Sequence, residues 1–151
     1  MADDHNADHD RAAVVAVHTF WARIEARDWA GVRRLLADAA TLTWHASNER
    51  FLDADAIVRV NAIYPEGWQV RVVDVAARYD GRVHSIVEVR HGDARHFANS
   101  LFRFDGARVT QIDEYWSSVD APPPWRNARA IGAYERFVPP PDLSPAPKGL
   151  P

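Results

Sequence analysis

The chain has 151 residues, 47% of them hydrophobic, which is the size of one domain with a core of its own. Its net charge of −3, with scattered arginines balanced by acids, gives no basic surface of the kind that binds nucleic acid. There is no cysteine, which excludes disulfides and thiol nucleophiles, and no apolar run approaches the roughly 20 residues of a membrane span. We expect a cytoplasmic globular protein with no nucleic-acid or membrane partner.

Composition divides the chain into a patterned body and two tails. Residues 1–11 are acidic and lack the apolar stretch of a signal peptide, so we expect a flexible N-terminal tail. Nine of the ten prolines lie after position 121, and residues 139–151 are Pro-rich, which predicts an extended C-terminal tail. The body, residues 12–138, is predicted to be a single domain.

The first part of the body carries the signals of three helices. The first has apolar residues at the 3/4 spacing of one helix face, namely Val14, Val17, Phe20, Trp21 and Ile24. Asp28 is a good N-cap for a second helix over residues 29–38. A third helix begins at Asp53 or Asp55 and ends before Pro65.

After the third helix the apolar period switches to two, which is typical of strands, and Asp-Gly or Gly-Asp pairs mark the turns. These signals predict a short strand over residues 41–46 and longer strands over residues 68–79, 83–90, 96–104 and 108–116. Helices followed by an antiparallel meander indicate an α+β fold. We expect three N-terminal helices packed in a curved antiparallel sheet, with one internal pocket.

Three segments carry a family likeness: ARDWAGVRRLLADAATLTWHA (26–46), DADAIVRVNAIYP (53–65) and FRFDGARVTQIDEYWSSVD (102–120). In this order they resemble the SnoaL-like and nuclear transport factor two-like superfamily, the relatives of polyketide cyclases and ketosteroid isomerase. The likeness covers about residues 12–120. It implies a cone-shaped fold, a homodimer and a small apolar or aromatic ligand. The ending APPPWRNARAIGAYERF resembles that of a bacterial subgroup of this superfamily whose role is undefined.

Ketosteroid isomerase needs three groups whose positions the resemblance identifies in this chain. The carboxylate base falls on Trp44, the oxyanion-binding tyrosine on Phe20, and the protonated aspartate on Ser100. An indole takes no proton from carbon, a phenyl ring has no hydroxyl, and serine is a poorer donor than a carboxylic acid. The isomerase reaction is therefore excluded.

Alternation along the last two strands places Glu114 on an apolar wall of the pocket, between Ile112 and Trp116. Desolvation there raises the pKa of a carboxyl group and suits it to acid-base catalysis. The alternative is a rim carboxylate paired with an arginine. The predicted pocket lining is Phe20, Trp44, Asn61, Tyr64, Ser100, Phe102, Ile112 and Trp116.

The strand over residues 83–90 has two orientations. With a three-residue loop after it, His84 and Glu88 face inward and join Glu114 as candidate catalytic groups. With a two-residue loop the register slips by one and sends both outward. We favour the second, in which three valines form the wall: Val83, Val87 and Val89.

The histidines show no metal-ligand spacing, and phosphate loops and HExxH are absent, so we expect no metal and no cofactor. Two functions fit. One is an enzyme doing acid-base chemistry (isomerisation, cyclisation, hydration or dehydration) on a small apolar substrate. The other is a non-catalytic ligand-binding or dimeric interaction domain whose aromatic side chains fill the pocket. Trp125 is expected to anchor the APPPWR segment over the sheet edge or pocket mouth.

Overall fold

The computed structural model describes the backbone of residues 2–139 and the side chains of residues 7–139. The helices are α1 (Ala2–Glu25), α2 (Trp29–Leu35), α3 (Ala54–Ala62) and the short α4 (Ala128–Ile131). The strands are β1 (Leu36–Trp44), β2 (Glu49–Phe51), β3 (Trp68–Ala77), β4 (Val83–His91), β5 (Ala94–Asp105) and β6 (Arg108–Ser118).

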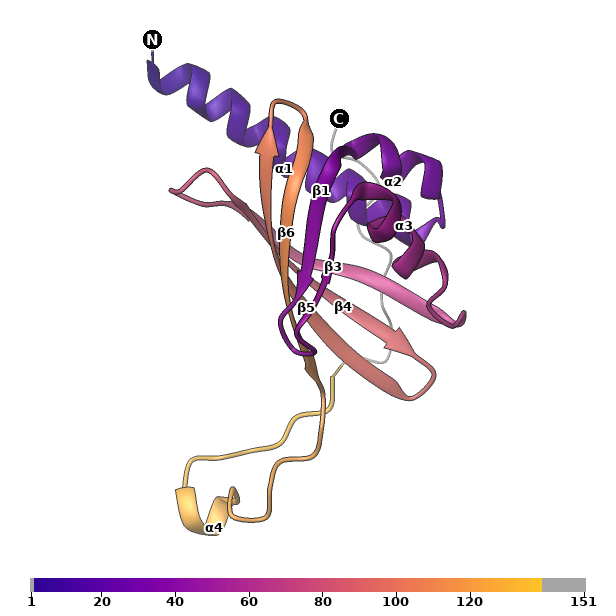
Figure 1. Ribbon diagram of the computed structural model, residues 1–151. Helices are drawn as coiled ribbons and strands as arrows, with labels where there is room; N and C mark the ends of the chain where they lie inside the picture. Colours follow the sequence, from indigo (N-terminus) through magenta and orange to yellow (C-terminus); the bar gives the residue numbers. More distant parts are fainter. Residues whose placement is uncertain (1, 140–151) are drawn as a thin grey trace.

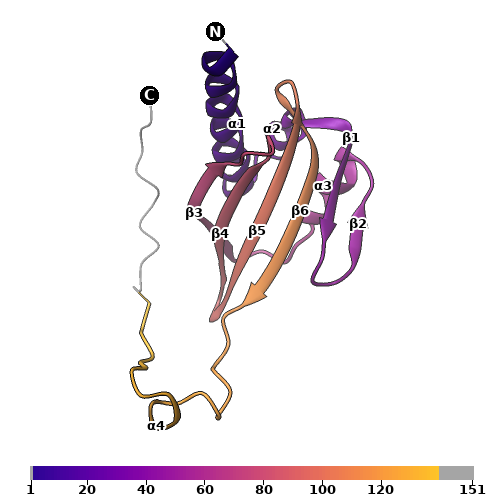
Figure 2. The same cartoon turned by 90° about the vertical axis from the view of Figure 1, so that its left-hand side faces the viewer.

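The six strands form one sheet in the order β2-β1-β6-β5-β4-β3. Neighbours are antiparallel except β1 and β6, which run parallel, so the sheet is mixed and not wholly antiparallel as expected. The sheet is curved, and α1, α2 and α3 lie on one side of it (Figures 1 and 2). The predicted α+β cone fold is confirmed.

Helix starts follow the sequence signals well. Asp28 caps α2 by accepting a 2.9 Å hydrogen bond from the Gly31 amide, and Asp53 caps α3 by accepting a 2.7 Å bond from the Ala56 amide. Helix α1 begins at Ala2, inside the segment expected to be an N-terminal tail. Acidic residues early in a helix suit the positive end of its dipole, which explains why the acidic segment continues the helix.

The concave face of the sheet packs against α1 through a cluster of aromatic side chains. Phe20 and Trp21 of α1 meet Phe102 of β5 edge-on, with ring centroids 5.3 and 6.3 Å from that of Phe102. The Trp21 indole N–H donates a 3.0 Å hydrogen bond to Ser85 Oγ, so its polar edge is satisfied inside the core. These side chains close the inner end of the cone.

The β4–β5 hairpin decides which residues face this core. His91 pairs with Ala94, so the loop contains two residues. The arrangement with a three-residue loop is therefore wrong, and the favoured one is confirmed. Val83, Val87 and Val89 are buried on the concave face.

After β6, residues 119–139 form an arm that extends away from the sheet (Figures 1 and 2). Trp125 is 71% exposed, so the expectation that it anchors this segment is wrong. Three successive prolines before it fix φ and favour an extended chain, which carries Trp125 away from the sheet. The predicted C-terminal tail lies outside the described residues except for Pro139.

Candidate ligand-binding cavity

A cavity of about 380 Å³ lies at the open end of the cone, opposite the aromatic cluster of the core. Helices α1 and α3, the β1–β2 turn and strands β3 to β6 all contribute to its wall. Its lining is Ile24, Trp44, Ala46, Ser47, Glu49, Val60, Asn61, Tyr64, Trp68, Val89, His96 and Trp116. The size falls within the range of about 300–1,000 Å³ found for small-molecule sites.

Aromatic rings form much of this wall and stand at steep angles to one another. Trp44 and Trp116 have centroids 6.3 Å apart and planes inclined by 75°. Tyr64 and Trp68 are 6.2 Å apart at 58°, and His96 lies 6.5 Å from Trp116 at 68°. The rings therefore form differently oriented parts of the cavity wall.

Four of the predicted lining residues contact the cavity: Trp44, Asn61, Tyr64 and Trp116. The other four lie deeper, in the packed core or behind the wall: Phe20, Ser100, Phe102 and Ile112. Sequence reasoning missed Trp68 and Glu49. Trp68 had a usable signal, since it opens a strand next to the predicted Tyr64, but the short β2 that holds Glu49 had none.

Glu114 lies behind the cavity wall and is not part of its lining. Its Oε1 accepts a 2.9 Å hydrogen bond from the Trp44 indole, and its Oε2 accepts a 2.7 Å bond from Ser100 Oγ. Its residue is 5% exposed, and burial raises the pKa of the carboxyl group although both hydrogen bonds oppose the rise. The alternative of a rim carboxylate paired with an arginine is wrong.

His84 and Glu88 lie on the opposite face of the sheet from Glu114. Glu88 has no exposed side-chain surface, and three guanidinium groups bind it at 2.6–3.0 Å, from Arg71, Arg90 and Arg95. Burial alone would raise its pKa, but the arginines outweigh burial and lower the pKa to about 2. His84 bonds to Asn99 at 3.2 Å. Neither reaches the cavity, so the inward placement of this pair is wrong.

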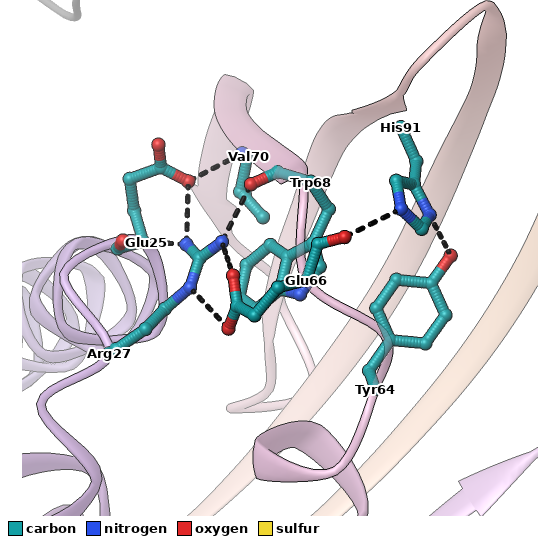
Figure 3. Close-up of polar contacts among 7 residues, drawn as sticks. All are labelled: Glu25, Arg27, Tyr64, Glu66, Trp68, Val70 and His91. Atoms are coloured by element: carbon teal, nitrogen blue, oxygen red, sulfur yellow. Dashed lines mark hydrogen bonds and ion pairs between the residues drawn. The ribbon is translucent and has the colours of Figure 1, made fainter.

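Arg27 holds the wall at Trp68 from outside (Figure 3). Its guanidinium lies 3.3 Å from the Trp68 ring centroid and donates to the Trp68 carbonyl at 2.7 Å. It also bonds both carboxylate oxygens of Glu66, at 3.3 and 3.0 Å, and the Glu25 carbonyl at 2.7 Å. Arg27 has φ of +57°, which is uncommon for a residue other than glycine, and these contacts hold it there.

A second set of bonds fixes Tyr64 at the cavity (Figure 3). His91 Nε2 donates to the Glu66 carbonyl at 3.0 Å, which leaves Nδ1 to accept from the Tyr64 hydroxyl at 3.3 Å. The segment between α3 and β3 is thus tied to Arg27 on one side and to His91 on the other. Two aromatic walls of the cavity are therefore preorganised.

Polar groups at the cavity are few. His96 Nδ1 lies 3.1 Å from Ser118 Oγ, and Glu49 is exposed at the rim. The buried Nε1 atoms of Trp68 and Trp116 have no hydrogen-bond partner among residues 7–139. Within the part of the chain that the structure describes, no three His, Asp or Glu side chains gather as metal ligands. None of the described helices has the length and apolarity of a membrane span.

The fold is the cone of nuclear transport factor two-like proteins, and solved structures share it. A protein of Kribbella flavida provisionally named a ketosteroid isomerase has a TM-score of 0.75 at 21% identity, over 86% of this chain and 93% of that one. An LEH-like epoxide hydrolase of M. tuberculosis has a TM-score of 0.59 at 17% identity, over 72% and 84%. A provisional polyketide cyclase of Xanthomonas campestris has 0.57 at 14% identity, over 71% and 91%.

No family model matches the sequence, and none of the curated proteins matches it. At these identities the structural likeness shows the fold, and it confirms the resemblance predicted from the sequence at that level. The three neighbours carry the names of three different reactions, so the function of this chain has to be inferred from the residues of its site and not from its fold.

Proposed function

We propose that this chain binds a small, largely apolar molecule in the cavity at the open end of its cone. The observation that carries the proposal is a cavity of about 380 Å³ walled by Trp44, Trp68 and Trp116. An apolar cavity with a few polar groups is the usual form of a small-molecule site. Because Arg27 and His91 hold two of the walls, ligand binding needs little ordering of side chains.

The proposal extends to acid-base chemistry on that ligand, with Glu114 as the proton-transfer group. Burial raises the pKa of Glu114, which favours the protonated acid that such chemistry uses. Trp44 lines the cavity and donates to this carboxyl group, so in this proposal a rotation of Trp44 accompanies proton transfer. His96 touches the cavity directly and is a second candidate for moving a proton.

The second candidate function is non-catalytic binding or assembly. The observation that favours it is the filled inner end of the cone, where Phe20 and Phe102 pack edge-on with centroids 5.3 Å apart. In this alternative Glu114 is structural. A cytoplasmic homodimer is part of both candidates, with the partner packed on the convex face of the sheet around the exposed Tyr115.

Thermal shift against small aromatic, polyketide-like, terpenoid and steroid compounds tests binding without assuming a reaction, because a ligand of the native state raises Tm. The matched variants are Val60→Trp, which fills the cavity, and Val15→Trp on an exposed position of α1. We expect one compound class to raise the Tm of wild type and Val15→Trp but not of Val60→Trp. A shift that persists in Val60→Trp, or no shift with any class, would contradict the proposal.

Catalysis is tested separately, once a ligand class is known. Glu114→Gln keeps the size of the side chain and removes the proton. Loss of turnover with retained binding supports the catalytic candidate. Unchanged turnover would show that Glu114 has a structural role, and His96 would then be the candidate to test for proton transfer.

A further inference from the structure

We infer that the cavity selects a ligand with an alkylammonium group over a neutral or anionic one of the same shape. The inference rests on the proposed function and names the chemical class of its ligand. It starts from the arrangement of the aromatic walls and from the charges around them.

The faces of aromatic rings attract cations, and cages of several rings are the usual recognition device for quaternary ammonium groups. Trp44, Trp116 and Tyr64 line one cavity, and the first two stand at 75° to each other. Rings at such angles present more than one face or edge to a group between them. A small alkylated cation thus meets several rings at once, with its methyl groups in apolar contact.

Among the residues that line the cavity, the permanent charge is negative, and His96 is the one imidazole. Glu49 supplies a carboxylate at the rim, and none of the described lining residues is Lys or Arg. Asn61 donates its amide N–H to the Ile57 carbonyl, which leaves its own oxygen as an acceptor. An anionic ligand would therefore lose its hydration without gaining a fixed positive partner.

Arg27 does not change this balance, because it lies on Trp68 from outside and its charge is paired with Glu66. Trp68 consequently acts as a fixed wall, and the attraction comes from the other rings.

Choline and 3,3-dimethyl-1-butanol give a matched test, because they share a shape and a hydroxyl group and differ in charge. Calorimetric or NMR titration of the full chain should give a Kd for choline at least about fivefold lower than for the alcohol. We expect Glu49→Gln to reduce this ratio about twofold, and Trp116→Leu to abolish it. Trp125→Leu, at an exposed tryptophan outside the cavity, should leave it unchanged.

Glu49 is exposed, so its variant folds even if Trp116→Leu does not. Equal or tighter binding of the neutral alcohol would overturn the inference and leave the proposed function standing. Absence of binding by both probes would also overturn the inference. The proposed function would then be tested separately, by the thermal-shift measurement with the compound panel and Val60→Trp. If the ratio of the two Kd values is unchanged in both Glu49→Gln and Trp116→Leu, choline binds outside the cavity, and this result would likewise overturn the inference.

Discussion

The two faces of the sheet each bury one glutamate, and the two carboxyl groups behave in opposite ways. On the concave face, Glu114 has two neutral donors, an indole and a hydroxyl, and its pKa rises. On the convex face, Glu88 has three guanidinium groups and its pKa falls to about 2. Both are inaccessible or nearly so. Burial alone therefore does not set the charge of a carboxyl group, and the charge of its donors does.

The difference separates a structural acid from the one that we propose for proton transfer. Glu88 is held as an anion that binds three arginines from neighbouring strands. Glu114 has a raised pKa and lies behind the cavity wall, which is why it is the proposed proton-transfer group. The sequence placed Glu114 inward and left two orientations open for Glu88, with the outward one favoured. The partners of the two carboxyl groups come from other strands and distinguish them.

The largest effect is expected from Glu88→Gln, which leaves three arginines without their common carboxylate. Removing one partner of a buried ion pair costs about 3 kcal/mol or more. Urea denaturation at pH 7 measures the loss. Because the folded pKa is depressed from 4.5 to about 2, this stabilisation is present above pH 4.5 and is lost as pH falls toward 2. A gap between wild type and variant that does not narrow below pH 4.5 would contradict the assignment.

Ser100→Ala should have the next largest effect. It leaves Glu114 Oε2 buried without its donor, at a cost of about 2 kcal/mol at pH 7. The variant should also raise the pKa of Glu114 further, since the Ser100 bond lowers it. Ser117→Ala, at an exposed position of β6, is the control in the same denaturation experiment. Equal stability of the two variants would argue that Glu114 finds another donor.

Arg71→Gln should cost less, about 1 kcal/mol, because this side chain is partly exposed and two arginines still bind Glu88. Added salt should reduce the loss measured by denaturation. A loss as large as that of Glu88→Gln would show that the three arginines do not share the carboxylate.

Glu114→Gln should change stability least, by under about 1 kcal/mol at pH 5, since an amide resembles the neutral acid and keeps both contacts. The folded pKa is raised above 4.5, so the contribution of Glu114 is present below pH 4.5 and is lost as pH rises through the folded pKa. The difference in the free energy of unfolding between variant and wild type should therefore move in favour of the variant as pH rises above 4.5, in the same denaturation measurement. A constant difference over that range would mean that Glu114 is ionised throughout.

Local signals in the sequence predicted much of this molecule. Asp28 and Asp53 cap their helices because capping is a short-range hydrogen bond that a few residues determine. Alternation correctly placed Ser100 and Glu114 on the same face, because the strand period of two is also local.

The predictions from the sequence that failed concern features that depend on contacts between distant segments of the chain. Whether a residue lines the open cavity or the filled core depends on how far α1 reaches into the cone, which put Phe20 in the core and Trp44 at the cavity. The parallel pairing of β1 with β6 has no local signature. Trp125 was expected to anchor the APPPWR segment over the sheet edge or pocket mouth, but the path of the arm leaves it exposed.

The placement of the tryptophans has an optical consequence. Three of the chain's six indoles surround one cavity, and a fourth, Trp125, lies in solvent on the arm. The protein's intrinsic emission is thus weighted toward the cavity, with a red-emitting background from the arm. In a Trp125→Leu variant that background disappears, and a change in the remaining emission would report binding of the proposed ligand without a dye or label.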